Sequence, residues 1–185
     1  MVSQYSVDEA TKKIVDAAVA EADVLGAEPL GEIAGPFSRA KLANGTTENR
    51  GGESTAGNLV AEVQRWATES ETTGSAQIAF MNPGGLRADM VGSGTDYPRT
   101  LTYKQAAEMQ PFANTLVNMR LTGAQIKGVL EQQWQPAGAS RPFLKLGTSK
   151  GFTYTYDPTA AAGSRITGMW LEGEAIDPAT SYSVT

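Results

Sequence analysis

The sequence contains neither cysteine nor histidine among its 185 residues. Without cysteine the chain cannot form a disulfide scaffold, a zinc–thiolate site or a thiol nucleophile. Without histidine it lacks the commonest metal ligand and the usual general base near neutral pH, and a Ser-His-Asp triad cannot be built from it. The two absences together indicate a chain that is poorly equipped to break bonds by itself.

A surplus of positive charge and long apolar runs are also missing. The net charge is −5 and the sequence pI is about 4.8, which argues against broad binding of a nucleic acid polymer. No stretch approaches the ~20 apolar residues of a membrane span. The length and the 41% hydrophobic content are ordinary for one globular domain. A few well-placed arginines can still create a local site for a small anion in such an acidic protein.

Apolar residues at helical spacing, together with capping residues, predict four helices. Ser6 and Glu9 form a capping box before a helix that ends at Gly26. The other three helices are predicted to begin at Ser54, Thr102 and Thr122.

Alternating or apolar runs predict short strands between and after these helices. The runs lie near Ile33 and at residues 76–81, 115–121, 152–156, 165–171 and 182–184. We therefore expect a fold of the α+β class, with a twisted mixed β-sheet flanked by helices. Because the chain stops inside the last predicted strand, we expect the domain to be truncated at its C-terminal end.

The first candidate binding segment is Asn82-Pro83-Gly84-Gly85-Leu86-Arg87, which follows the predicted strand at 76–81. Glycines at such a place let the backbone approach a ligand closely, and Arg87 offers a planar cation suited to phosphate or carboxylate. A tight turn followed by an exposed arginine is the simpler interpretation of these six residues taken alone.

Two further segments combine polar and aromatic residues in a way that suits a nucleotide. Arg50 lies just before the helix that begins at Ser54, where exposed amides and the helix dipole favour an anion, although Glu53 and Ser54 could simply cap that helix. In the second segment, Phe112 could stack on a base while Asn114 bonds its edge. The alternative for Phe112 is a core side chain after a turn proline.

The order of these segments resembles a known family. The motifs are Arg50…Glu53-x-x-x-Gly57-Asn58-Leu59, Asn82-x-Gly84-Gly85-Leu86-Arg87, Pro111-Phe112-x-Asn114, Leu121-Thr122-Gly123 before Leu130-Glu131, and Phe143-Leu144-x-x-Gly147. Together they resemble the C-terminal domain of the 5′-nucleotidases, a group that includes periplasmic UDP-sugar hydrolases and 2′,3′-cyclic nucleotide phosphodiesterases. The opening segment resembles the linker helix of those enzymes. The resemblance therefore implies a linker helix at 1–26 and a substrate-binding domain at 27–185.

The resemblance also implies a division of labour between two domains. In this family an N-terminal metallophosphatase domain holds two divalent metals and attacks the phosphoester, while the C-terminal domain binds the nucleotide and rotates relative to its partner. No metal or cofactor is then expected in this chain itself. Its expected partners are a nucleotide or nucleoside substrate and the metallophosphatase domain of the same protein. The family further implies an extracellular, cell-wall or periplasmic location.

The substrate-binding residues that the resemblance implies can be named by matching positions. They are Arg50, Asn82, Arg87, Phe112, Asn114 and Gly147. The two arginines would hold the phosphate or its surroundings, and the first asparagine would contact the nucleoside. The aromatic ring would stack on the base, the second asparagine would bond the base edge, and the glycine would let the backbone come close to the base.

Three hypotheses for the function follow. The chain is the recognition domain of a metal-dependent nucleotidase, a non-enzymatic nucleotide-binding or cell-surface module on the same scaffold, or an enzyme that uses Asp and Glu alone. The third is disfavoured because no carboxylate pair has a recognisable catalytic spacing. A preceding domain with Asp-x-His and Asn-His-Glu metal motifs would distinguish the first hypothesis from the second.

We predict that the chain alone binds nucleotides weakly and hydrolyses none. The family usually carries a second aromatic residue and an aspartate after the last strand, and this chain ends at Thr185, so its base clamp would have one wall. Calorimetric titration with AMP or adenosine tests this, and a dissociation constant in the low micromolar range would contradict it. Phosphatase assays with added manganese or cobalt should show no turnover.

Overall fold

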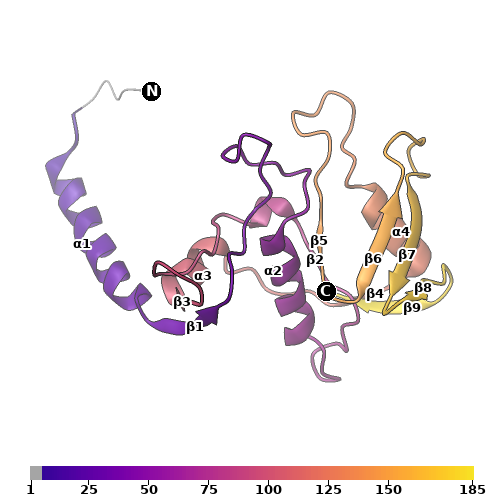
Figure 1. Cartoon of the computed structure of the whole chain (residues 1–185), viewed down its shortest axis with the longest axis horizontal. Coiled ribbons are helices and arrows are strands. Elements are labelled where there is room, and N and C mark those ends of the chain that lie inside the picture. The colour runs from indigo at the N-terminus through magenta and orange to yellow at the C-terminus, as the bar shows by residue number, and fades with distance from the viewer. Residues whose placement is uncertain (1–5) are drawn as a thin grey trace.

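The computed structural model of the chain describes residues 6–185 and shows two packed regions side by side, with one helix projecting from the N-terminal end (Figure 1). The helices are α1 (Glu9–Gly26), α2 (Thr55–Ala67), α3 (Tyr103–Met109) and α4 (Gly123–Glu131), with a 3-10 turn at Pro83–Gly85. The strands are β1 (Pro29–Ile33), β2 (Phe80–Met81), β3 (Arg99–Thr102), β4 (Met119–Thr122), β5 (Gly147–Thr148), β6 (Phe152–Tyr156), β7 (Ile166–Leu171), β8 (Glu174–Ala175) and β9 (Ser181–Val184).

Side-chain caps set the starts of the helices. Ser54 accepts a hydrogen bond from the third amide of α2, and Thr102 caps α3. Thr122 and Gln125 complete a capping box at α4, with the Gln125 side chain 2.8 Å from the Thr122 amide. These three predicted starts are confirmed. The predicted capping box at Ser6 is wrong, because Asp8 caps α1.

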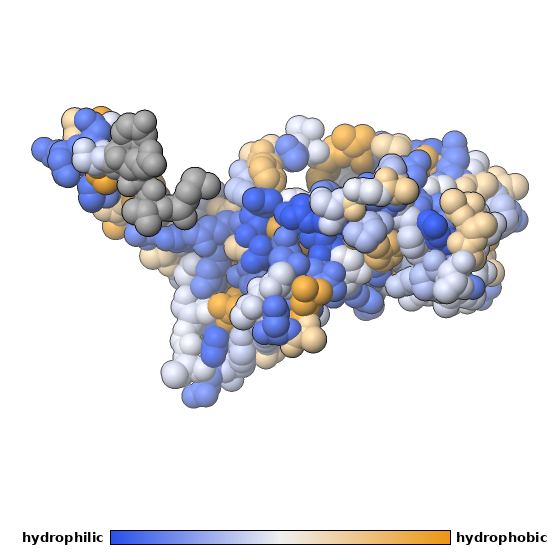
Figure 2. Space-filling view, turned by 90° about the horizontal axis from the view of Figure 1, so that it is seen from above, coloured by the Kyte–Doolittle hydropathy of each residue, from blue (hydrophilic) through white to orange (hydrophobic). Residues whose placement is uncertain are grey.

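Helix α1 stands away from the rest of the molecule, and its surface mixes hydrophilic and apolar residues (Figure 2). Ile14, Val24 and Leu25 remain 72%, 76% and 67% exposed. Only Gly26 is buried, against Lys104 of α3, which also forms an ion pair with Asp23. The rest of the molecule leaves these apolar side chains uncovered. The division into a linker segment at 1–26 and a domain at 27–185 stays a prediction. Residues 1–5 lie outside the described part.

The strands at the centre of the molecule form a mixed arrangement, as the α+β prediction requires. Antiparallel pairs join β2 to β5 and β4 to β9. A parallel bridge between Ile78 and Val184 links the two pairs, and the amide of Thr185 donates to the carbonyl of Ile78 at 2.9 Å. The sheets β1-β3 and β6-β7-β8 are not hydrogen-bonded to these pairs, so the strands do not form one continuous sheet.

Two hydrophobic cores lie on either side of β2. The first contains buried residues of α2 and α3, and the second is built around α4, β6, β7 and β9. Met81 belongs to the first core and Phe80 packs against the second, because neighbouring side chains of a strand point to opposite faces. The chain that leaves β2 therefore starts at the boundary between the two cores.

Backbone contact between α2 and β5 brings the two regions close together. A Cβ atom on Gly147 would lie 2.3 Å from the carbonyl carbon of Gly57, so no larger residue fits there. Next to this contact, the amide of Thr148 donates to the Asn58 side chain at 3.2 Å. Glycine at position 147 is thus required for the packing of a helix on a strand.

We expect Gly147→Ala to destabilise the protein by about 1–3 kcal/mol, because its methyl group must displace backbone atoms. Gly128→Ala is the matched control, since a Cβ at position 128 in α4 meets nothing within 4 Å. That substitution should stabilise the protein by about 0.5–1 kcal/mol through higher helix propensity. Urea unfolding measures both, and equal effects of the two variants would contradict the packing argument.

Candidate functional site

The turn that follows β2 is the centre of the candidate site. Asn82 precedes the 3-10 turn at Pro83–Gly85, and Leu86, only 2% exposed, anchors the turn in the first core. A Cβ atom on Gly84 would lie 3.3 Å from the side-chain nitrogen Nδ2 of Asn82, and a Cβ atom on Gly85 would lie 3.4 Å from the side-chain oxygen Oδ1 of Asn82. The two glycines thus leave room for the Asn82 amide, whose two ends face different sides of the turn.

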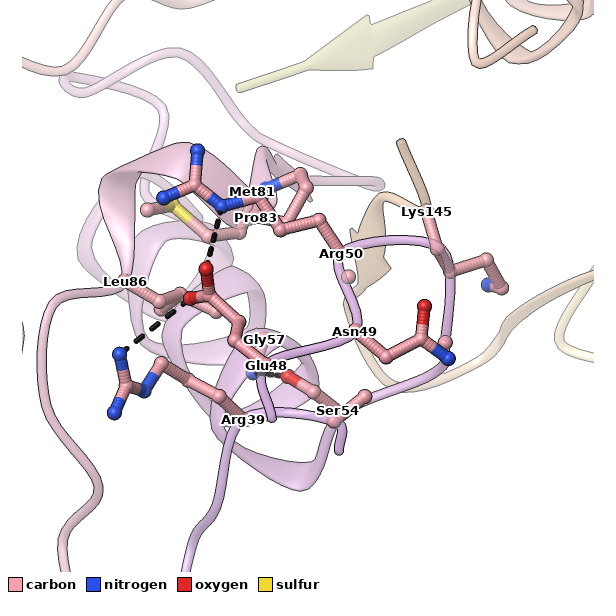
Figure 3. Close-up of a pocket in the computed structure, with 13 residues that line it drawn as sticks. Arg39, Glu48, Asn49, Arg50, Ser54, Gly57, Met81, Pro83, Leu86 and Lys145 are labelled. Atoms are coloured by element: carbon pink, nitrogen blue, oxygen red, sulfur yellow. Dashed lines mark hydrogen bonds and ion pairs between the residues drawn. The ribbon is translucent and has the colours of Figure 1, made fainter. Parts of the chain in front are cut away.

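Arg50 approaches this turn from the loop before α2. Its side chain is 18% exposed, and its Nε donates to Glu48 Oε2 at 2.9 Å. Its Nη1 lies 3.5 Å from the position that a Cβ on Gly84 would take. Figure 3 shows the Glu48 carboxylate between the guanidinium groups of Arg50 and Arg39. The Nε side of the Arg50 guanidinium is therefore paired with the Glu48 carboxylate, and Nη1 lies next to the turn.

The ion pair at Arg50 is the end of a longer chain of charges. Glu48 also accepts from Arg39 Nη1 at 3.4 Å, and Arg39 donates from Nε and from its backbone amide to Asp89 Oδ1, both at 2.9 Å. Lys41 lies 3.1 Å from the other Asp89 oxygen. Burial by itself raises the pKa of Asp89, but the amide and guanidinium of Arg39 and the ammonium of Lys41 outweigh it, so this pKa lies below its ordinary value. Three cations against two carboxylates leave a local surplus of one positive charge.

Arg87 reaches the same turn by a different contact. Its Nη1 donates to the carbonyl of Gly84 at 3.5 Å, and its guanidinium carbon lies 5.9 Å from the centre of the Phe112 ring. Phe112 is 56% exposed, so the alternative interpretation of this residue as a core phenylalanine is wrong. Both arginines therefore flank Gly84, and the aromatic ring lies beside the more exposed one.

Two cavities adjoin the turn. The larger, of about 350 Å³, is lined by Asn82, Phe112 and Asn114, and Gln110 helps to shape it by donating to the Gly85 carbonyl at 2.7 Å. The smaller, of about 280 Å³, lies between the turn and the end of α4 and is lined by Arg50 and Asn82. Asn82 is thus a wall shared by both cavities.

The six residues implied by the sequence do not line one common cleft. Three of them line the larger cavity, while Arg50 lies in the smaller one. Arg87 lines neither cavity, although it touches the Phe112 ring from outside. Gly147 lies with Arg50 along a third, narrow gap that also reaches Pro83, and it is pressed against Gly57. Its small size serves helix packing, and neither the larger nor the smaller cavity includes it.

Several residues that shape the site were missed from the sequence. Gln110 stands at the start of the segment that carries Phe112, so its position was a usable signal. Glu48 and Arg39 lie close to Arg50 in the chain but outside any motif. Asp89 had no signal, because its contact with Arg39 joins residues 50 positions apart.

The walls of the two cavities consist mainly of amide, arginine and apolar groups. No Asp or Glu side chain lines either cavity, whereas Glu48 lines the narrow gap beside Arg50 and Pro83. Within residues 6–185 no group of three or more acidic side chains is placed to hold a metal ion. In the same part of the chain, no helix has the length and apolar character needed to cross a membrane.

Comparison with known proteins gives a family match over most of the chain. The family model described as 5′-nucleotidase, C-terminal domain, matches residues 29–185. A solved structure of a 5′-nucleotidase precursor from Thermus thermophilus superimposes with a TM-score of 0.70 at 29% identity, covering 94% of this chain and 32% of that one.

Two curated relatives carry other names. The Endonuclease YhcR of Bacillus subtilis is 26% identical over 72% of this chain, and the Cell wall protein Lmo0130 of Listeria monocytogenes is 30% identical over 58%. This chain spans only 9% and 13% of these relatives. The names of these relatives therefore describe much longer proteins, of which this chain matches only a small part.

We expect Asp89→Asn to destabilise the protein at pH 7 by about 1–3 kcal/mol, the range for hydrogen bonds to charged groups. Since folding lowers the pKa of Asp89, its contribution is complete above the unfolded pKa and is lost as the pH falls through the folded one. The difference from the unsubstituted protein should therefore vanish between about pH 5 and pH 2. The control is the exposed Asp96→Asn, which should cost less than about 0.5 kcal/mol. Urea unfolding across this pH range is the measurement, and a difference that persists at low pH would count against the ion-pair network.

Proposed function

The chain belongs to the 5′-nucleotidase C-terminal domain family, and from this premise we propose that it recognises the nucleotide substrate of a metal-dependent phosphoric ester hydrolase. The observation that carries the proposal is the meeting of Arg50 and Arg87 at Gly84, with Phe112 5.9 Å from Arg87. Two guanidinium groups suit a phosphate, and an exposed ring beside them suits a base.

The two cavities suggest how a nucleotide would be placed. The base would enter the larger cavity, where Phe112 offers a stacking face and Asn114 an amide for the base edge. Stacking of a base on an aromatic side chain contributes about 1–3 kcal/mol. The Asn82 amide would contact the nucleoside, and the phosphate would lie near Gly84, where the two arginines approach.

The hydrolytic step would belong to a preceding domain of the same protein. Two divalent metals there would activate the attacking water and stabilise the charge that develops on the phosphoryl group. This chain would bind and orient the substrate, which agrees with cavity walls made of amides, arginine and apolar groups. The likeness to the Thermus thermophilus 5′-nucleotidase precursor supports this arrangement.

We further propose that the ligand is a nucleotide or nucleoside and not a nucleic acid polymer. The chain is acidic overall, with a net charge of −5, whereas proteins that follow a polyphosphate backbone carry a broad basic surface. The similarity to an endonuclease does not oppose this, because it covers only 9% of that protein.

A location outside the cytoplasm and a role in nucleotide catabolism are parts of the same proposal. The name of the Listeria relative, a cell wall protein, supports the location. That relative also keeps a second candidate open, namely a non-enzymatic nucleotide-binding or cell-surface module on the same scaffold. The sequence that precedes this chain distinguishes the two, because only the hydrolase requires metal-binding motifs there.

We expect Phe112→Ala to weaken binding of both AMP and adenosine by about 5- to 150-fold, the equivalent of the stacking energy. Arg87→Ala should weaken AMP binding and leave adenosine binding nearly unchanged. Tyr103→Ala is the matched control, since Tyr103 is 58% exposed but lies on α3 outside both cavities. Titrations followed by NMR measure weak affinities of this kind. Equal effects of the two aromatic substitutions would refute the proposed base site.

A further inference from the structure

The carboxylate of Glu48 lies between two arginines, and this placement gives it a role at the binding site. We propose that Glu48 is a positioning residue that holds Arg50 against the Asn82–Gly85 turn, with Arg39 and Asp89 as its anchor. The proposal rests on the proposed function, in which Arg50 meets the phosphate of the substrate.

The first step is the fixed position of Glu48 itself. Its backbone pairs with Lys41 in an antiparallel bridge, and the amide of Leu42 donates to the carbonyl of Thr47 next to it. Its two carboxylate oxygens are used by different partners, Oε2 by Arg50 and Oε1 by Arg39. The side chain is 27% exposed. The Glu48 side chain is hydrogen-bonded through both carboxylate oxygens, and its backbone is held by the bridge to Lys41. It therefore has little freedom to turn away from either arginine.

The second step is the anchor behind it. Arg39 makes two hydrogen bonds to one oxygen of Asp89, and Lys41 occupies the other oxygen. The Asp89 side chain is only 16% exposed, so these charge-assisted bonds are strong ones. Arg39 therefore cannot swing toward solvent without leaving a largely buried carboxylate poorly paired.

The third step is the orientation that Arg50 is left with. Its Nε is taken by Glu48, and its carbonyl accepts from the Lys145 amide at 2.8 Å. Its Nη1 lies beside Gly84, within the wall of the smaller cavity. A long, flexible side chain loses rotamer freedom when it grips a ligand, and a side chain that is already held loses less. Removing the tether should therefore weaken phosphate binding.

An opposite effect is expected if Glu48 acts only through its charge. A carboxylate 2.9 Å from Arg50 Nε reduces the positive potential that a phosphate experiences. Removing a residue that acted only in this way would tighten the binding of an anion. The sign of the change in AMP affinity therefore separates positioning from simple charge compensation.

The test compares AMP with adenosine in NMR titrations of the whole chain. We expect Glu48→Ala to weaken AMP binding about tenfold, while adenosine binding changes less than twofold. Glu48→Gln, which keeps the acceptor oxygen for Arg50, should lose less than threefold. The control is Glu71→Ala, which removes the same charge from an exposed loop position and should leave both affinities unchanged.

A second pair of variants makes the test independent of one substitution. In the background of Arg50→Ala, the further change Glu48→Ala should have no additional effect on AMP. Arg39→Gln, which cuts the anchor and leaves the Glu48–Arg50 pair in place, should weaken AMP binding about threefold with adenosine unaffected. If Glu48→Ala fails to fold, the Arg39→Gln result decides the proposal alone.

Failure of the inference differs visibly from failure of the proposed function. If Arg50→Ala weakens AMP binding while Glu48→Ala leaves it unchanged or tightens it, the positioning role is refuted and the binding site stands. Equal losses for AMP and adenosine in Glu48→Ala would also refute positioning, because they indicate general damage to the structure. If Arg50→Ala leaves AMP binding unchanged, both the phosphate role of Arg50 and the inference are refuted.

Discussion

Packing of Phe80 and Met81 against cores on opposite sides of β2 is the constraint on which the rest of the structure depends. Each of the two cores takes one of these neighbouring side chains, so the short strand cannot shift along the chain without exchanging the two. The chain emerges from β2 at the boundary between the cores and turns at once through Asn82–Gly85. The candidate site lies at this boundary because the turn does.

The parts of the fold that local signals specify could be predicted from the sequence. Ser54, Thr102 and Thr122 cap their helices as expected, since a cap depends on residues three positions apart. Strand β5 was missed because two residues give no periodicity, and only its contacts with β2 and Gly57 define it. For the same reason the predicted strand at 115–121 begins only at Met119, where β9 provides a partner.

In the candidate site, too, features made of neighbouring residues in the sequence could be predicted, and contacts between distant residues could not. The glycine turn and the arginine that follows it could be recognised because they are contiguous. What could not be predicted is which of the implied residues share a cavity, since this depends on packing between the end of α4, the segment before β5 and the turn. The bond between Arg39 and Asp89 is equally invisible in the sequence, although it anchors the charge network that carries Arg50 and a surplus of one positive charge.

The Asn82 side chain gives the two cavities a shared chemical polarity. Its side-chain nitrogen is nearer Gly84, and Gly84 lines the Arg50 cavity. Its side-chain oxygen is nearer Gly85, and Gly85 lines the Phe112 cavity. The donor end of the amide thus lies toward the glycine of one cavity and the acceptor end toward the glycine of the other. A half-turn of the amide exchanges both at once, so a ligand group that selects one orientation on its own side also dictates the hydrogen-bonding partner that is offered on the other.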